Sequence, residues 1–280
     1  MIRYANSGDL GQIRDLWETC FPDETGFNEY FLANLFELEH VLLYVLEGRI
    51  AAMTQMIPRE IRFASDRAEC CTYIYGACTH PEYRRKHLMS KLLERSFVLD
   101  RSLGRKCSVL IPAERWLFDF YRSFGYQPVF DLHTAELAAE PQKCVLLSML
   151  SGSDVPAMDT LYEGQFASAL PHLTRNHLEW TKQIHMFQTI GLGCFGLRDA
   201  TGQLLGYAFA WRPEKGVVYA QEVAARSKDA KRMLLEAVSA FAGVRRIRYS
   251  DFAEPAEKIG CMKRYDDLDV PIAYMNLMMN

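Results

Sequence analysis

The sequence contains no apolar run long enough to cross a membrane. A membrane-spanning helix needs about 20 consecutive apolar residues, whereas the longest candidate, around Val41–Leu46, has only the length of a strand. The first residues also lack the basic segment and apolar core of a secretory signal peptide. We therefore expect a cytoplasmic protein that does not associate with membranes.

Cysteines and basic residues are present without the patterns that would give them special roles. The eight cysteines contain no CxxC motif and only one adjacent pair, so we expect neither a disulfide framework nor a metal site. The 32 lysines and arginines are balanced by 35 acidic residues, and the net charge is -3. This balance argues against a nucleic-acid partner, because nucleic-acid-binding proteins usually carry an excess of positive charge.

The composition is that of a folded globular protein, with 49% hydrophobic and 24% charged residues. A length of 280 residues suits one large domain or two ordinary ones. Hydrophobic periodicity predicts the order β-α-α-β-β-β-α-β-α-β in the first half. The expected strands are Ile2–Ala5, His40–Leu46, Ile50–Ile57, Ala68–Thr79, Lys106–Ile111 and Gln127–Leu137. Four helices are expected. The first begins after Ser7 as its N-cap and the third begins near Leu88, while the second spans Asn28–Phe36 and the fourth spans Glu114–Ser123.

The second half repeats this order without repeating the sequence. Its expected strands are Val145–Met149, Cys194–Leu197, Leu204–Trp211, Val217–Glu222, Arg246–Ser250 and Ile272–Leu277. Its expected helices are Val155–Phe166, Thr174–His185, Lys228–Phe241 and Pro255–Cys261. We therefore predict an α/β (α+β) fold of two tandem mixed-sheet domains, residues 1–138 and 139–280.

The segment from Tyr75 to Leu93 runs from a strand through a basic turn into a helix. The turn contains Arg84, Arg85 and Lys86. Free backbone N–H groups in a first helical turn and the positive end of the helix dipole both favour an anion. The sequence therefore predicts an anion site, for which a diphosphate is a good ligand; a solvated helix start is the alternative.

This segment resembles the acetyl-CoA-binding motif of the GNAT superfamily of N-acetyltransferases, a strand followed by x-P-x-x-R/Q-x-x-G-x-G/A and a helix. Pro81 and Arg84 match the motif, whereas His87 and Met89 stand at its two glycine positions. A helical φ is open to any residue, so we expect His87 to weaken cofactor binding without abolishing it. The resemblance implies that acetyl-CoA is held by Ala77, Cys78, Thr79, Arg84, Arg85, Lys86, His87, Leu88, Met89 and Ser90.

A second segment, after the next predicted strand, resembles the GNAT pattern N-x-x-A-x-x-F-Y-x-x-x-G-F. Phe120, Tyr121 and Gly125 match it, whereas Glu114 and Leu117 replace the usual Asn and Ala. The resemblance implies that Tyr121 is the general acid that protonates the departing CoA thiolate. The alternative is a core tyrosine at a helix end that Gly125 terminates.

The tandem arrangement resembles, over nearly the whole chain, the enhanced-intracellular-survival type of acetyltransferase without its sterol-carrier-like third domain. In that type the second acetyltransferase-like domain lacks a cofactor site, so we expect the same of residues 139–280. There the C-terminal carboxylate of the third domain reaches the active site. Because this chain ends at Asn280 without such a domain, that base does not carry over, and the sequence names no other.

Eight acidic residues and no lysine or arginine occur between Asp15 and Gly48. In the GNAT fold the loop between the first two helices borders the acceptor site, so the resemblance implies that Asp23 and Glu24 attract a cationic amine. A solvated acidic face is the alternative interpretation.

The sequence Gly191–Gly196 spells GxGxxG, the phosphate-binding fingerprint of dinucleotide folds. That fingerprint must follow a strand and open a helix, whereas the residues after Gly196 have the pattern of a hairpin between strands. We therefore expect no nucleotide site there.

These features together predict an acetyl-CoA-dependent N-acetyltransferase. The acceptor is a primary amine of a small molecule or peptide, which attacks the thioester directly in a ternary complex without a metal. A homo-oligomer is compatible with the sequence. The alternative is a non-catalytic acetyl-CoA-binding regulator or a structural pseudo-acetyltransferase, favoured by the departures at His87, Met89, Glu114 and Leu117.

Overall fold

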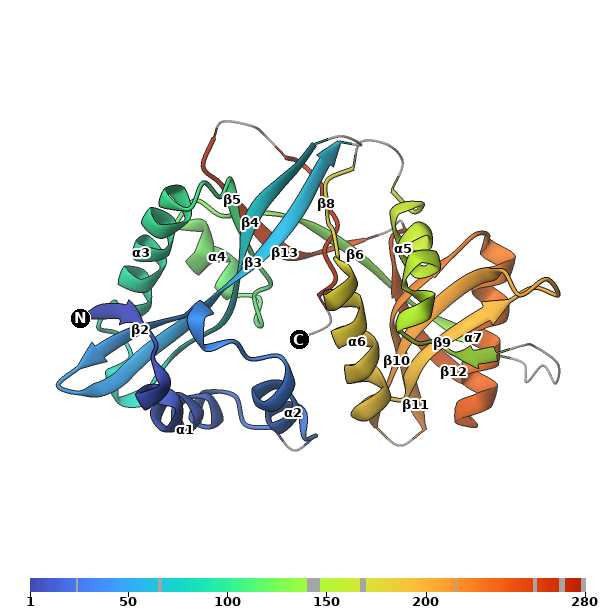
Figure 1. The fold of residues 1–280 in the computed structure, drawn as a ribbon, viewed down its shortest axis with the longest axis horizontal. Helices are drawn as coiled ribbons and strands as arrows, with labels where there is room; N and C mark the ends of the chain where they lie inside the picture. The colour runs from blue at the N-terminus through green and yellow to red at the C-terminus, as the bar shows by residue number, and fades with distance from the viewer. Residues whose placement is uncertain are drawn as a thin grey trace. The chain divides into compact units, whose positions relative to one another are not determined.

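The computed structural model describes residues 1–23, 25–64, 67–139, 147–166, 170–214, 216–253, 256–266 and 270–277. The chain forms two compact units (Figure 1). Unit 1 combines residues 1–130 with 258–273, and unit 2 combines residues 131–257 with 274–280. The predicted α/β class is confirmed. The boundaries of these units differ from the predicted domain boundary at residue 138. The last strand of the first half of the sequence belongs to unit 2, and the last strand of the second half belongs to unit 1.

The sheet of unit 1 has the strand order β1-β2-β3-β4-β5-β13. Its strands β4 and β5 are parallel, and the other neighbours are antiparallel. The final pairing joins Cys107–Leu110 to Cys261–Arg264, from the C-terminal part of the chain. The strand bounds are β1 (Ile2–Tyr4), β2 (Val41–Leu46), β3 (Arg49–Ala64), β4 (Arg67–Thr79), β5 (Cys107–Leu110) and β13 (Glu257–Arg264).

Helices cover both faces of this sheet. Successive strand residues point to opposite faces: Ile74 packs in the cluster with Leu88 and Leu92 of α3, whereas Tyr75 contacts Trp17 of α1. The helix bounds are α1 (Leu10–Cys20), α2 (Phe27–Asn34), α3 (Leu88–Ser102) and α4 (Leu117–Arg122). The side chain that caps the first helical turn belongs to Asn6, and not to Ser7 as the sequence indicated.

The sheet of unit 2 has the equivalent order β7-β9-β10-β11-β12-β6, in which β11 and β12 are the parallel pair. The strands are β6 (Gln127–Ala138), β7 (Leu147–Met149), β9 (Gly193–Arg198), β10 (Leu204–Glu214), β11 (Val217–Ala225) and β12 (Arg246–Asp251), and a two-residue strand β8 covers His172–Leu173. The helices are α5 (Val155–Glu163), α6 (His177–Thr189) and α7 (Lys228–Ala242).

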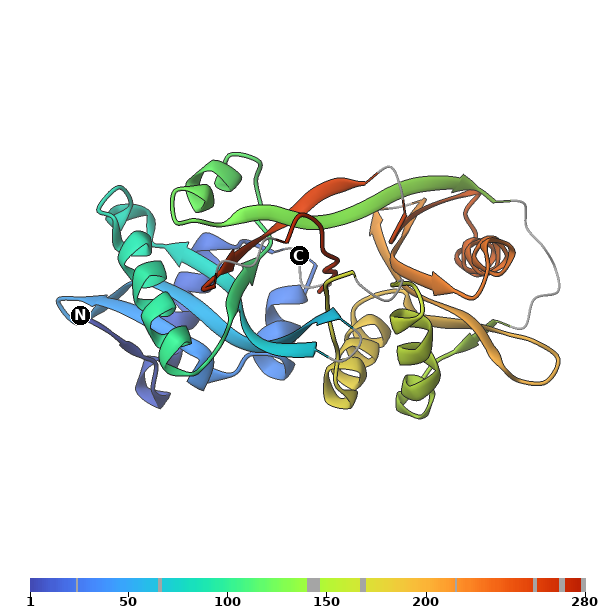
Figure 2. The ribbon, with the colours of Figure 1, turned by 90° about the horizontal axis from the view of Figure 1, so that it is seen from above.

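The core of unit 2 also lies on both faces of its sheet, because successive strand residues point to opposite faces. Ala208 of β10 packs in a cluster with Leu234 of α7, whereas the neighbouring Tyr207 and Phe209 contact Trp180 of α6. Figure 2 shows α7 on one side of these strands and α5 and α6 on the other. Within the described residues, none of the helices combines the length and apolar character that crossing a membrane requires.

Two predicted elements near the C-terminus are wrong. Pro255 lies outside the described residues, and the rest of the helix expected at Pro255–Cys261 is strand β13 (Glu257–Arg264), whose residues 261–264 pair with the distant strand β5, a contact that local periodicity does not reveal. The strand expected at Ile272–Leu277 is reduced to isolated bridges at Ala273 and Tyr274 within the described part of this segment. The GxGxxG segment leads into strand β9 and its hairpin with β10, as expected.

Candidate functional site

The parallel pairing of β4 with β5 stops well before β4 ends. Its register covers Cys71–Tyr73 against Cys107–Val109, while β4 continues beside β3 to Thr79. In the described parts of the chain, no strand pairs with the β5-facing side of Ala77–Thr79. Backbone groups along this edge are therefore available to an extended ligand.

A bulge bends β4 directly before this edge. Cys78 pairs with Met53 and Tyr75 pairs with Gln55, so Gly76 and Ala77 both lie opposite Thr54. Gly76 has a φ of +57°, and a Cβ atom there would lie 2.4 Å from Trp17 Cζ3. Glycine is therefore required both by the backbone conformation and by the close approach of α1.

The turn between β4 and α3 leaves the N-terminus of the helix open. A 3-10 turn at Pro81–Tyr83 is followed by Arg85 and His87, which have φ angles of 62° and 57°. His87 is the N-cap residue, and its side chain accepts no hydrogen bond from the first helical N–H groups. The helical φ expected at His87 is thus wrong. The backbone adopts the left-handed conformation that glycine favours.

The three basic residues of the turn are exposed beside this open helix N-terminus. Arg84 Nε donates to the backbone oxygen of Thr79 at 3.3 Å, which holds its guanidinium at the end of β4. Lys86 Nζ lies 5.1 Å from the centre of the Tyr83 ring. Leu88 is buried, so at that position only the backbone N–H can meet a ligand. The arrangement combines positive side chains with unpaired donors, which suits a phosphate group.

Tyr121 of α4 lies in the same apolar cluster as Leu88, against which Ala77 and Met89 also pack. Its ring makes edge contacts with Phe120 and Tyr126, at centroid distances of 5.2 and 5.7 Å. Burial, with a smaller contribution from Cys261, raises the pKa of Tyr121 to about 12. The side chain is a core residue whose phenol keeps its proton at neutral pH.

Asp23 folds the loop between α1 and α2. One carboxylate oxygen accepts from Thr25 N at 2.8 Å and Thr25 Oγ1 at 2.6 Å, and the other accepts from Asn28 N at 2.8 Å. Burial opposes ionisation, but these hydrogen bonds outweigh it and lower the pKa of Asp23. Glu24 lies outside the described residues.

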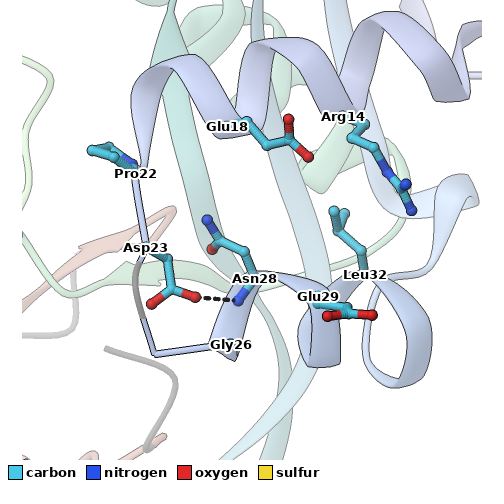
Figure 3. A pocket seen from close by; sticks show the side chains of 8 residues that line it. All are labelled: Arg14, Glu18, Pro22, Asp23, Gly26, Asn28, Glu29 and Leu32. Atoms are coloured by element: carbon cyan, nitrogen blue, oxygen red, sulfur yellow. Dashed lines mark hydrogen bonds between the residues drawn. The ribbon is translucent and has the colours of Figure 1, made fainter.

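A cavity of about 560 Å³ opens beside this loop (Figure 3). Its charged lining consists of Glu18, Asp23, Glu29 and Arg14, so acidic groups are in excess. Pro22, Gly26, Asn28 and Leu32 complete the lining. All of these residues belong to α1, α2 and the segment that joins them.

Unit 2 has no comparable open turn in its described residues. Only Arg226 and Ser227 separate β11 from α7. Ser227 Oγ accepts from Ala230 N at 3.1 Å, so the chain itself caps the N-terminus of α7. The equivalent position in unit 2 is therefore closed to an anion.

Residues 1–129 match the family model of an acetyltransferase (GNAT) domain. No curated protein sequence matches the chain. Similar solved structures include a GCN5-related N-acetyltransferase from Anabaena variabilis ATCC 29413, with 17% identity, 95% of this chain and 73% of that chain covered, and a TM-score of 0.71. A GCN5-related N-acetyltransferase from Kribbella flavida has 17% identity and a TM-score of 0.70, with 94% of this chain and 69% of that chain covered. Eis1 from Mycobacterium abscessus has 14% identity and a TM-score of 0.64, with 95% of this chain and 74% of that chain covered. The expected resemblance is thus confirmed, and the similarity of fold extends over both units.

Proposed function

We propose, from the acetyltransferase (GNAT) domain that residues 1–129 carry, that this protein transfers an acetyl group from acetyl-CoA to a primary amine of a small molecule or peptide. The observation that carries the proposal is the open N-terminus of α3 beside the basic turn. Unpaired N–H groups and positive side chains together favour a diphosphate.

The cosubstrate fits the residues around this turn in two parts. Its diphosphate would accept from the N–H groups of Leu88, Met89 and Ser90, near Arg84, Arg85 and Lys86. The left-handed residue His87 turns the backbone into the helix, and its exposed ring leaves the N–H groups open. The pantetheine arm would lie along Ala77, Cys78 and Thr79, where no strand of the described residues pairs with the β5 side of β4.

Tyr121 is suited to the departing thiolate. The amine nitrogen attacks the thioester carbonyl carbon, the carbon–sulfur bond breaks, and the sulfur receives a proton from the Tyr121 hydroxyl. A lysine-like amine has a pKa near 10.4, so it must first lose a proton to a base or water. Holding both reactants in one site contributes more to the rate than any single side chain.

The acidic cavity beside the α1–α2 loop supports a cationic acceptor. Asp23 stays ionised at neutral pH because its pKa is lowered, and Glu18 and Glu29 add further acidic side chains. In this proposal Asp23, together with Glu24, attracts the amine while its hydrogen bonds shape the loop. Residues 139–280 contribute a copy without a cofactor site, which agrees with the self-capped helix α7.

The decisive experiment measures cofactor binding and turnover on the same preparation. Calorimetry with acetyl-CoA should show one site per chain. A thiol-release assay with polyamines, aminoglycosides and peptide N-termini should show CoA release that depends on the amine. Binding without CoA release for every amine would favour a non-catalytic acetyl-CoA-binding regulator, and absence of binding would favour a structural pseudo-acetyltransferase.

A further inference from the structure

Two cysteines from different elements meet beside the basic turn. Cys20 is the last residue of α1, and its thiol donates to the Thr79 backbone oxygen at 3.6 Å. Cys78 directly precedes Thr79 in β4, and the side chains of Cys78 and Arg84 both influence the pKa of the Cys20 thiol. Arg84 Nε donates to the same Thr79 oxygen at 3.3 Å. Helix α1, the end of β4 and the first basic residue of the turn thus converge on this thiol pair.

The surroundings make the two thiols chemically unequal. The hydrogen bond from Cys78 and the charge of Arg84 outweigh burial and lower the pKa of Cys20 to about 7. Burial instead raises the pKa of Cys78. Because the thiolate is the nucleophile, Cys20 is the attacking sulfur and Cys78 is the one that resolves the product. Cys20 is half-buried, so a small molecule can reach it.

Other cysteines of the described chain lack this combination. Cys71 and Cys107 also hydrogen-bond to each other, but both are buried, and burial raises the pKa of Cys71. Cys70 is exposed and lies toward the other end of β4, eight residues before Cys78. Cys70 is therefore an internal control for the accessibility of a thiol, and Cys71 with Cys107 is an internal control for the pairing of two thiols.

We propose that Cys20 and Cys78 are a thiol modification site that a small-molecule disulfide converts into an intramolecular disulfide, and that a diphosphate bound at Arg84 opposes this conversion. In the first step the Cys20 thiolate attacks the reagent RSSR, which gives Cys20–S–SR and releases RS⁻. Cys78 sulfur then attacks Cys20 sulfur and displaces the second RS⁻, and the Cys78 proton passes to a departing thiolate. The reagent disulfide is thus reduced to one thiol and one thiolate, while the Cys20 thiolate and the Cys78 thiol are oxidised to a disulfide.

The effect of the diphosphate follows from the shared arginine and rests on the proposed function. A phosphate group near Arg84 engages its guanidinium and adds negative charge beside the cluster. Both changes disfavour the Cys20 thiolate and slow its attack. Binding and oxidation are therefore coupled through one charged side chain.

The test treats the full-length reduced protein with glutathione disulfide and follows it by intact mass and peptide mapping. The expected product has lost two hydrogen atoms and contains linked Cys20 and Cys78 peptides. Cys70→Ser should form this disulfide at the unchanged rate. Cys20→Ser and Cys20→Ala should form none, and Arg84→Gln should slow it by about tenfold, the expected order when a thiolate loses its cation. Thermal melting checks that each variant is folded.

A stable glutathione adduct on Cys20 without linkage to Cys78, or oxidation no faster than glutathionylation of Cys70, would overturn the thiol pair. CoA lacking the acetyl group should slow the reaction several-fold at saturation, and equal rates with CoA shown to be bound by calorimetry would overturn the coupling. If calorimetry shows no CoA binding, the proposed function fails while the result with free protein still decides the thiol pair.

Discussion

At the scale of single residues, Tyr121 combines a buried ring with a phenol that stays protonated. Tyr121→Phe keeps the ring contacts and deletes only the hydroxyl, so folding and acetyl-CoA affinity should be nearly unchanged. We expect kcat and kcat/KM to fall together by roughly 10²–10⁴, the usual contribution of a general acid. Because the pKa is raised to about 12, loss of the Tyr121 proton should not reduce the wild-type rate at mildly alkaline pH.

Tyr126→Phe is the matched control for this measurement. The Tyr126 hydroxyl lies 2.7 Å from Ser108 Oγ in the core, and its ring contacts Tyr121. Its removal should lower the melting temperature and leave kcat within about twofold of wild type, because no role in proton transfer is proposed for it. If Tyr121→Phe turns over within about threefold of wild type while chemistry limits the rate, Tyr121 is only a core residue.

His87 holds a left-handed backbone conformation that costs an L-residue roughly 1–2 kcal/mol. His87→Gly removes this strain but increases the entropy of the unfolded chain, so stability should change by less than about 1 kcal/mol. Acetyl-CoA affinity should be preserved or improved. His87→Val should be less stable, because a β-branched residue disfavours positive φ.

Denaturation and calorimetry on both His87 variants test this explanation. A loss of affinity of about tenfold or more in His87→Gly would mean that the imidazole itself contacts the phosphate. Equal stabilities of the glycine and valine variants would contradict the strain argument.

Asp23 has two separable effects, its charge and its hydrogen bonds within the loop. Asp23→Asn removes the charge, so KM for cationic amines should rise and its dependence on salt should flatten. Thr25→Ala removes a hydrogen bond to the same carboxylate without changing charge. Steady-state kinetics at two ionic strengths distinguish the effects. An equal rise of KM in both variants would assign Asp23 to loop geometry, and an unchanged KM in Asp23→Asn would leave the acidic residues as a solvated face.

At the scale of elements, the turn between β4 and α3 differs from its counterpart between β11 and α7 in length, charge and capping. Reversing the charges of Arg85 and Lys86 to Glu should weaken acetyl-CoA binding by about 1–3 kcal/mol, or about 5- to 150-fold. These two residues are preferable to Arg84, which also bonds to Thr79. Calorimetry at several salt concentrations measures the effect.

Arg95→Glu provides the control for this charge reversal. Arg95 is exposed on the same helix, about two turns beyond its N-terminus. Its reversal should change affinity by less than about threefold, because solvent and salt screen exposed charges at that separation. An unchanged affinity in the Arg85 and Lys86 variant would contradict the diphosphate assignment.

Most elements could be predicted because local periodicity determines them. The stripe of Leu88, Leu92 and Leu93 specifies α3, and the strand-to-helix order around Arg84 locates the turn. The conformation of His87 could not be predicted, because it depends on how the whole turn closes. The pairing proposed for Cys20 could not be predicted from the sequence, because Cys20 and Cys78 are distant along the chain and only folding brings α1 to the end of β4.

At the scale of the whole molecule, the last strand in the sheet of each unit comes from the other half of the sequence. Met262 of β13 is 2% exposed, so Met262→Asp should place a charge in the core of unit 1 and destabilise it by several kcal/mol. We expect loss of acetyl-CoA binding, although the residues assigned to the cofactor lie between 77 and 90.

Met149→Asp makes the same chemical change at a position in unit 2 that is 49% exposed. This control should retain binding and lose little stability, since its charge stays in water. Denaturant unfolding compares the stability of the two variants, and calorimetry compares their acetyl-CoA binding. Full binding by a folded Met262→Asp protein would show that β13 does not support the cofactor-binding unit.

The pairing of β5 with β13 also determines the order of events during synthesis. A ribosome makes the chain from its N-terminus, and domains usually fold as they emerge. Here β5 stays an exposed sheet edge until residues 261–264 have been made, some 150 residues later. The backbone N–H and C=O groups on this edge of β5 therefore stay unpaired through most of translation. During that time they can pair with a strand of another chain, which would misassemble the nascent first half.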